Sequence, residues 1–318
     1  MNILVGAPNA NFDIEKMEQK MVTHPGLTKE KLFFANQSIS KADLKSIDIL
    51  IGYDQKLLSA MLSDPDSNLK WIQSLSVGID YYPLAEIKNR GVRLATVKGI
   101  HSEPIAETVT GMILNQFRNL SMITNLNRWE KPTNPFKILP NKTAVIYGTG
   151  AIGSRVAEIL KVLNVNTIGI NHSGHQAKFF DQTFTMDAVN DQIKNAEIII
   201  NSLPLMPATN KFFNQPYFEQ FTRQPLFINV GRGGSVVTED LINALNQHQL
   251  GGASLDVIDP EPFPSDSPLW KMDNVFISPH IASLFDQYGD QALDIFSKNL
   301  REYEYDGALL VNEVNLNR

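Results

Sequence analysis

The sequence contains no cysteine, which excludes disulfides, thiolate chemistry and cysteine-based metal sites. It also lacks any uninterrupted run of about eighteen apolar residues, so we expect no membrane-spanning helix and no membrane partner. The N-terminal segment carries no Lys or Arg before its apolar run, unlike the start of a signal peptide, and we interpret residues 2–5 as a first β-strand. These absences favour a cytoplasmic protein.

A basic excess is missing as well. The chain has 28 Lys and Arg against 34 Asp and Glu, a formal net charge of −6. Because no basic block is present, we expect no nucleic-acid partner. Hydrophobic residues make up 43% of the chain and charged residues 19%, which is ordinary globular usage. At roughly 100–200 residues per domain, a length of 318 residues predicts two domains.

Short apolar runs alternate with segments of helical spacing along almost the whole chain. This alternation predicts βαβ units and parallel sheets, an α/β fold. An amphipathic stretch follows residue 283, and the proline-containing segment 129–135 is expected to be a surface loop. The predicted strands are 2–5, 47–52, 69–75, 92–97, 143–147, 165–170, 197–202, 226–230, 252–257 and 275–277.

A glycine-rich turn follows one of these predicted strands and leads into a helical pattern. Gly148, Gly150 and Gly153 form the pattern G-x-G-x-x-G, with Ala151 and Ile152 before the last glycine. The first glycine permits the tight turn, the second lets the backbone approach a pyrophosphate, and the third lets the helix pack on the strand. Since both the strand and the helix are present, the turn predicts a dinucleotide-binding domain.

The carboxylate expected about 20 residues further on, where it would bind the ribose, is missing. Asn171 stands at that place, and no carboxylate occurs before Asp181. An aspartate would repel a 2′-phosphate, whereas Asn171 does not, so we favour NADP(H) as the cofactor. The alternative is that Asn171 hydrogen-bonds the ribose of NAD(H). Donors to a 2′-phosphate follow in the sequence: His172, Ser173, His175 and Lys178.

Three further segments begin where predicted strands of the same domain end. They carry Arg232, Glu261 and His280. Ligands of open parallel sheets bind outside the carboxyl ends of the strands, so we expect these three side chains to converge on one crevice. Each residue taken singly is compatible with a surface or turn position, but the three segments together predict a site.

With the glycine turn, these segments resemble the D-isomer-specific 2-hydroxyacid dehydrogenase family, which includes glyoxylate/hydroxypyruvate reductases, D-lactate dehydrogenases and phosphoglycerate dehydrogenases. The resemblance covers nearly the whole chain. It implies two Rossmann-like or flavodoxin-like domains with parallel sheets and a cleft between them. The substrate domain would be residues 1–97 plus 284–318, and the dinucleotide-binding domain residues 98–283.

The resemblance also implies residue roles and a homodimer. Arg232, Glu261 and His280 take the catalytic positions, and Val77 and Gly78 match the loop that holds the substrate carboxylate together with Arg232. Asp256 matches the carboxylate that binds the nicotinamide amide. The expected cofactor-binding set is Gly148, Gly150, Ala151, Ile152, Gly153, Asn171, His172, Ser173, Leu203, Pro204, Val230, Gly231 and Asp256.

The chemistry of these residue types fits the reduction of a 2-keto acid. Arg232 presents a planar fork that matches a carboxylate and can polarise the adjacent carbonyl. His280 is the natural proton donor near neutral pH, and a carboxylate such as Glu261 nearby would favour its charged form. We therefore expect an enzyme that transfers a hydride between NAD(P)H and a small 2-keto or D-2-hydroxy acid, with His280 as acid and base.

Other functions of the same fold stay open. Formate dehydrogenase pairs its histidine with a glutamine, and Glu261 argues against it. A non-enzymatic dinucleotide-sensing interaction protein retains the same three residues, although this chain lacks long tails that would carry partner motifs. The remaining histidines show no metal-ligand spacing, so we predict no metal site. Candidates to line the substrate side chain are Tyr53, Leu75, Ser76 and Phe285.

Overall fold

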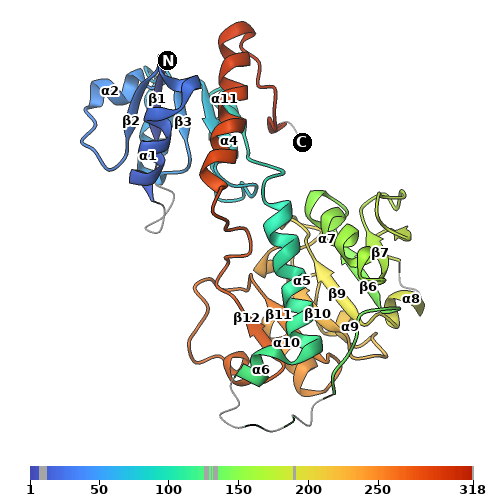
Figure 1. The fold of residues 1–318 in the computed structure, drawn as a ribbon. Helices are drawn as coiled ribbons and strands as arrows, with labels where there is room; N and C mark the ends of the chain where they lie inside the picture. Colours follow the sequence, from blue (N-terminus) through green and yellow to red (C-terminus); the bar gives the residue numbers. More distant parts are fainter. Residues whose placement is uncertain (7–12, 125–128, 130, 132–134, 189–190, 317–318) are drawn as a thin grey trace. The chain divides into compact units, whose positions relative to one another are not determined.

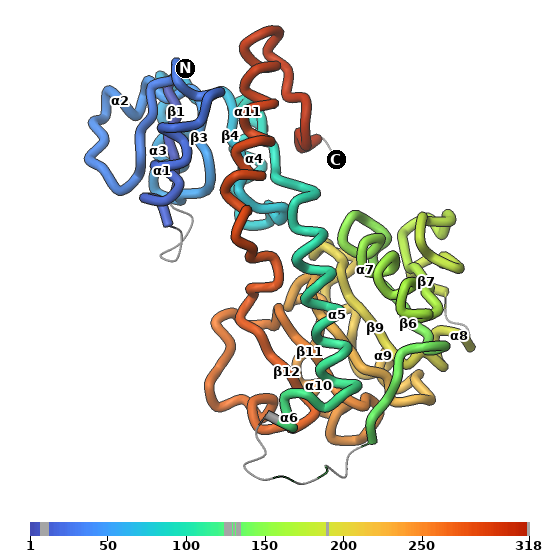
Figure 2. Tube along the Cα trace, in the orientation of Figure 1, coloured from blue at the N-terminus to red at the C-terminus, as the bar shows by residue number. Residues whose placement is uncertain are grey.

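The structure is a computed structural model that describes residues 1–6, 13–124, 129, 131, 135–188 and 191–316. The chain divides into two compact units (Figure 1). Unit 1 comprises Met1–Ile100 and Phe285–Arg318, and unit 2 comprises His101–Leu284. Figure 2 traces the chain from unit 1 into unit 2 and back again. The predicted loop 129–135 falls largely on residues 130 and 132–134, which lie outside the described residues.

Unit 1 is built on a five-stranded sheet in the order β2-β1-β3-β4-β5, within the described residues, and all its paired strands are parallel. This is the flavodoxin-like order of a doubly wound sheet. Its strands are β1 (Asn2–Val5), β2 (Lys31–Phe34), β3 (Ile49–Ile51), β4 (Trp71–Gln73) and β5 (Arg93–Ala95). Its helices are α1 (Ile14–Thr23), η1 (Pro25–Leu27), α2 (Lys41–Ser46), α3 (Gln55–Ser63), α4 (Leu84–Asn89) and α11 (Tyr288–Asp306).

Unit 2 is built on a seven-stranded parallel sheet in the order β12-β11-β10-β9-β6-β7-β8, again within the described residues. Its strands are β6 (Thr143–Tyr147), β7 (Asn166–Ile170), β8 (Gln182–Phe184), β9 (Ile198–Asn201), β10 (Leu226–Asn229), β11 (Gly252–Leu255) and β12 (Val275–Ile277). Its helices are α5 (Ser102–Arg118), α6 (Leu120–Thr124), α7 (Ala151–Val162), α8 (Asp191–Lys194), α9 (Gln215–Phe218), η2 (Gly233–Ser235), α10 (Thr238–Asn246) and η3 (Pro268–Lys271).

The central strands in both units are buried on both faces because their residues alternate between two hydrophobic cores. In β6, Ala144 and Ile146 face a core shared with α5 and α7, whereas Val145 and Tyr147 face the core beneath α9 and α10. Figure 1 shows α5 running across the sheet of unit 2. This two-sided burial explains why the strands of the sequence are nearly continuous apolar runs rather than alternating ones.

The predicted α/β class with two parallel sheets is confirmed. Two strands, β2 and β8, were missing from the sequence prediction. Both lie at a sheet edge and are only partly buried, so they need no long apolar run. Within the described part of the chain, no helix is both long and apolar enough to cross a membrane.

The strand order of unit 2 reverses between β6 and β9, since the chain continues from β6 outward through β7 and β8 and then returns to the other side. Such a reversal opens a crevice at the carboxyl ends of the two strands, where open α/β sheets bind ligands. The glycine turn begins directly after β6, and the segments that carry Arg232, Glu261 and His280 follow β10, β11 and β12.

Candidate active site

The glycine turn joins β6 tightly to α7. Gly148 has a positive φ of 96°, and its N–H donates to the carbonyl of Ile170 at 2.9 Å. A Cβ on Gly153 would lie 1.8 Å from the carbonyl oxygen of Gly148, far inside van der Waals contact. The first and third glycines are therefore required by the turn and by the close packing of the helix on the strand.

The N-terminus of α7 fits a dinucleotide pyrophosphate. Gly150 is the N-cap, the first turn has no acidic residue, and no side chain caps it. Gly150 and Ala151 are exposed, while Ile152 is half-buried against the core. A Cβ built on Gly150 would meet no heavy atom within 4 Å, so open space lies beside the backbone there. Helix N-termini of this kind bind phosphate through their N–H groups and the helix dipole.

The loop after β7 is held by Asn171, the residue in the acidic position of the dinucleotide motif. Its Oδ1 accepts from the backbone N–H groups of Ser173 (3.2 Å) and Gly174 (2.7 Å). Its Nδ2 donates to the Thr149 hydroxyl and to the carbonyl of His175, both at 3.1 Å. Asn171 thus shapes the loop through both ends of its amide. The side chains that the loop exposes are His172, Ser173, His175, Gln176, Lys178 and, at its end, Asp181.

Two buried asparagines at the ends of β9 and β10 organise the backbone around Arg232. Asn201 donates through Nδ2 to Oδ1 of Asn229 and to Oγ of Ser235, each at 2.8 Å. Asn229 donates to the carbonyl of Arg232 at 3.2 Å, and the Ser235 hydroxyl donates to the same carbonyl at 2.7 Å. Sequence reasoning missed Asn201, Asn229 and Ser235, although an amide ending an apolar strand is a usable signal.

Leu203, Pro204, Val230 and Gly231 lie in the connections that follow β9 and β10. The Leu203 and Val230 side chains are buried, and Pro204 is exposed. The Leu203 N–H donates to Oδ1 of Asn201 at 3.1 Å, so the same amide network fixes this backbone as well. Leu203, Val230 and Gly231 can therefore contact a ligand only through their backbone, whereas the Pro204 ring is exposed.

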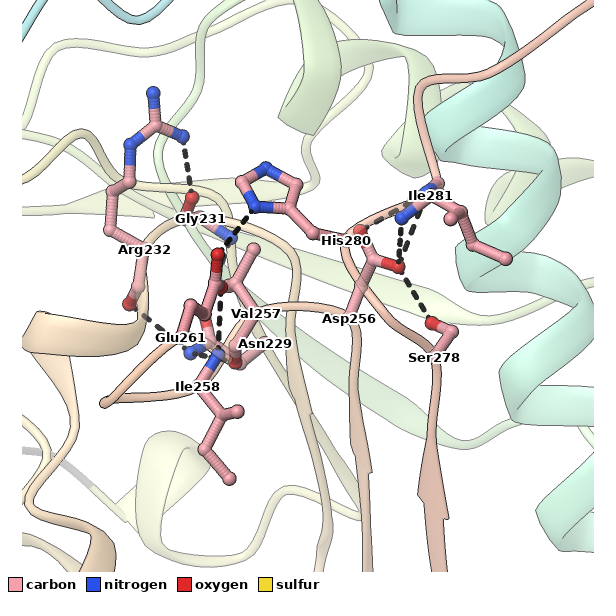
Figure 3. Close-up of polar contacts among 11 residues, drawn as sticks. Asn229, Gly231, Arg232, Asp256, Val257, Ile258, Glu261, Ser278, His280 and Ile281 are labelled. Atoms are coloured by element: carbon pink, nitrogen blue, oxygen red, sulfur yellow. Dashed lines mark hydrogen bonds and ion pairs between the residues drawn. The ribbon is translucent and has the colours of Figure 1, made fainter. Parts of the chain in front are cut away.

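Arg232, Glu261 and His280 come from three connections of unit 2. His280 Nδ1 and Glu261 Oε2 are 2.9 Å apart, and both side chains are nearly half exposed, at 49% and 42%. Nη1 of Arg232 donates to the carbonyl of Gly231 at 2.8 Å. Figure 3 shows the His280 ring turned toward Glu261, with the Arg232 guanidinium and the His280 ring both lying above the Glu261 carboxylate in this view. The structure therefore pairs Glu261 with His280 and places Arg232 beside this pair.

Asp256 is buried, with 4% of its surface exposed, directly after β11. Its Oδ1 accepts from the Ser278 hydroxyl at 2.6 Å and from the backbone N–H of Ile281 at 2.9 Å (Figure 3). The carboxylate of Asp256 therefore binds the segment that carries His280, on both sides of that residue. Ser278 was not among the predicted site residues, because its contact with Asp256 depends on the register between two strands.

Val77 and Gly78 lie in a loop of unit 1 that hydroxyl groups hold in shape. The Ser76 hydroxyl donates to the carbonyl of Gly78 at 2.6 Å and lies 2.5 Å from the Tyr81 hydroxyl. The Tyr81 ring also packs edge-on against Tyr53, with 4.9 Å between centroids. Tyr53, Leu75, Ser76 and Phe285, the candidates for lining the substrate side chain, all belong to unit 1.

The order of strands in unit 2 is that of sheets that bind dinucleotides at the point of reversal, and the glycine turn lies at that point. Among the described residues, no group of three His, Cys, Asp or Glu side chains could hold a metal ion. The open helix N-terminus fits the pyrophosphate of a dinucleotide, and a histidine–glutamate pair follows neighbouring strands at the same end of the sheet. These features are those of a Rossmann-type dinucleotide-binding domain.

The comparison with protein families then names the group. The NAD-binding domain of the D-isomer-specific 2-hydroxyacid dehydrogenases matches residues 110–282. The chain belongs to this family, which confirms the resemblance inferred from its motifs. The protein is accordingly an NAD(P)-dependent oxidoreductase of 2-hydroxyacid substrates.

Individual relatives agree with this assignment. The chain is 32% identical to the glyoxylate reductase/hydroxypyruvate reductase of Mus musculus over 239 residues, which cover 72% of this chain and 71% of that protein. A family member from Aeromonas salmonicida has a TM-score of 0.83 at 28% identity, over 99% of both chains. The NADPH-dependent glyoxylate/hydroxypyruvate reductase of Sinorhizobium meliloti, solved with NADP and sulfate, has a TM-score of 0.82 at 25% identity, over 99% of this chain and 98% of that one.

Proposed function

We propose that this protein reduces a small 2-keto acid to the D-2-hydroxy acid with NAD(P)H, and that His280 donates the proton. The observation that carries the proposal is the 2.9 Å contact between His280 Nδ1 and Glu261 Oε2. A carboxylate on Nδ1 orients the ring and leaves Nε2 as the atom that faces the substrate. In reduction Nε2–H protonates the ketone oxygen, and in oxidation Nε2 takes the proton back.

Arg232 is the proposed partner of the substrate carboxylate and of the carbonyl oxygen. The buried amides of Asn201 and Asn229 fix the backbone of Arg232, so its side chain extends from a rigid main chain. A planar guanidinium donates two parallel hydrogen bonds to a carboxylate and stabilises the negative charge that grows on the adjacent oxygen. We propose that the backbone N–H groups of Val77 and Gly78 bind the same carboxylate.

The proposed cofactor site is the first turn of α7, with the pyrophosphate on the N–H groups beside Gly150 and Ala151. When bound, the reduced nicotinamide supplies the hydride. Of the two cofactors we favour NADP(H), because the first part of the loop after β7, residues 171–178, exposes only neutral and basic side chains: His172, Ser173, His175, Gln176 and Lys178. The Sinorhizobium meliloti relative, named as NADPH-dependent, supports this preference.

Glyoxylate and hydroxypyruvate are the substrates we propose first, since the names of several relatives state them. From the family resemblance we further propose a cytoplasmic homodimer. Light scattering of the purified protein tests the dimer, which has twice the chain mass of 35.6 kDa.

The function is tested by following the loss of NADPH or NADH absorbance with glyoxylate, hydroxypyruvate, pyruvate and branched 2-keto acids. The proposal expects turnover with at least one acid and a higher kcat/KM for NADPH than for NADH. A tenfold preference for NADH would overturn the cofactor assignment alone. Binding of NADPH without turnover of any acid would instead favour a dinucleotide-sensing protein.

A further inference from the structure

The turn that carries His280 is unusual in its backbone. His280 has a φ of 56°, in the left-handed region that few residues other than glycine adopt without cost. Its N–H donates to the carbonyls of Asp256 (2.8 Å) and Ser278 (3.0 Å). A side chain on a strained backbone keeps its direction only where the surroundings determine that backbone fully.

Asp256 makes most of the hydrogen bonds that hold the backbone of this turn. Its Oδ1 accepts from the Ser278 hydroxyl at 2.6 Å and from the Ile281 N–H at 2.9 Å, and the Ala282 N–H lies 3.2 Å from Oδ1 and 3.1 Å from Oδ2. The backbone and side chain of Asp256 together therefore bind the turn before, at and after His280. An ionised carboxylate makes about four such bonds, and hydrogen bonds to it are the stronger kind.

We infer that Asp256 is a positioning residue for proton transfer, because it fixes the turn from which His280 projects. This inference rests on the proposed role of His280 and goes beyond the nicotinamide contact that the family resemblance implies for Asp256. The two roles differ in their consequences. A contact with the nicotinamide changes cofactor binding, whereas a change in the direction of His280 slows the proton transfer after both ligands have bound.

Two serines near Asp256 offer a matched pair of variants, one in β11 and one directly after β12. Ser278→Ala removes the hydroxyl that donates to Asp256 and leaves the carboxylate in place. Ser254→Ala removes a hydroxyl from strand β11 itself, two residues before Asp256, where Ser254 Oγ is buried and has no hydrogen-bond partner among the described residues. Both variants delete one buried Oγ atom from the same region of the sheet, but only the first one loosens the contact with the His280 turn.

We expect Ser278→Ala to lower kcat about tenfold, since a displacement on the order of 1 Å costs as much as a hundredfold in rate. The dissociation constant of NADPH, measured by fluorescence titration, should stay within about threefold of the wild-type value. The solvent deuterium isotope effect on kcat should rise, because proton transfer then limits the rate more strongly. Ser254→Ala should leave kcat, the NADPH dissociation constant and the isotope effect unchanged.

Asp256→Asn provides the second test, run at a temperature where circular dichroism shows the variant to be folded. The amide keeps one acceptor oxygen but presents N–H₂ to the Ala282 N–H, so kcat should fall about a hundredfold or more. Normal kcat in Ser278→Ala, or a rise in the NADPH dissociation constant that accounts for the whole loss in Asp256→Asn, would overturn the inference. Both results presuppose wild-type turnover, so they leave the proposed function itself intact.

Discussion

Gly150 and Gly153 stand three residues apart in the same turn, and the structure predicts opposite consequences when each is replaced by alanine. A methyl group on Gly153 would lie 1.8 Å from the carbonyl oxygen of Gly148, whereas ordinary contact begins at 3.4 Å. Closing that difference requires the backbone of β6 and α7 to separate. Overpacking of this kind costs roughly 1–3 kcal/mol, sometimes more. A unit of this size loses about 2–4 °C of Tm per kcal/mol, so Tm should fall by roughly 2–12 °C.

Gly150→Ala should leave the fold unchanged. Its φ of −75° suits alanine, and the added methyl group meets no heavy atom within 4 Å. The methyl group does occupy the space beside the helix N-terminus, where the pyrophosphate must approach the backbone. The NADPH dissociation constant should therefore rise at least about tenfold, a loss of about 1.4 kcal/mol.

Differential scanning fluorimetry measures the stability of both variants, and fluorescence titration measures NADPH binding. The expected pattern is a lower Tm in Gly153→Ala and weaker binding at normal Tm in Gly150→Ala. Normal NADPH binding in Gly150→Ala would mean that the pyrophosphate lies elsewhere. A normal Tm in Gly153→Ala would refute the close packing of α7 on the turn.

Three more predictions follow from single side chains. Burial lowers the pKa of His101 from 6.5 to about 4, so the unfolded chain binds this proton first as the pH falls. His101 should therefore cost roughly 3 kcal/mol of stability between pH 6.5 and about 4, and His101→Gln should show a smaller loss of urea-unfolding free energy over that window. Arg232→Lys should lower kcat/KM for a 2-keto acid at least about a hundredfold without weakening NADPH binding, because a point charge cannot replace the planar fork. Asn171→Asp should lower kcat/KM for NADPH relative to NADH at least about tenfold, since a carboxylate repels the 2′-phosphate; an unchanged ratio would contradict the 2′-phosphate assignment.

The central strands were predictable because they are buried on both faces and their apolar runs are unbroken. β9, for example, lies within the predicted strand 197–202 and all its residues are buried. The edge strands β2 and β8 escaped prediction for the complementary reason. Each is short and only partly buried, so hydrogen bonding to a neighbour, which no local pattern reveals, decides its structure.

The candidate site divides in the same way. The segments that carry Arg232 and Asp256 could be placed at the carboxyl ends of strands from their position along the chain, whereas the predicted role of Asp256 came from the family resemblance. The contacts of Asn201 with Asn229 and of Asp256 with Ser278 join neighbouring strands, and they depend on registers that only the folded sheet defines. The loop-building bonds of Asn171 likewise follow from the path of the loop after β7.

The role of His280 as proton donor is tested most directly by the kcat of His280→Asn with the best 2-keto acid of the wild-type protein. Asparagine tolerates the left-handed backbone at this position, so the variant should keep the wild-type Tm within a few degrees and bind NADPH normally. Its kcat should fall by roughly 10²–10⁴, the usual contribution of a general acid. A kcat close to that of the wild-type protein would show that another group delivers the proton.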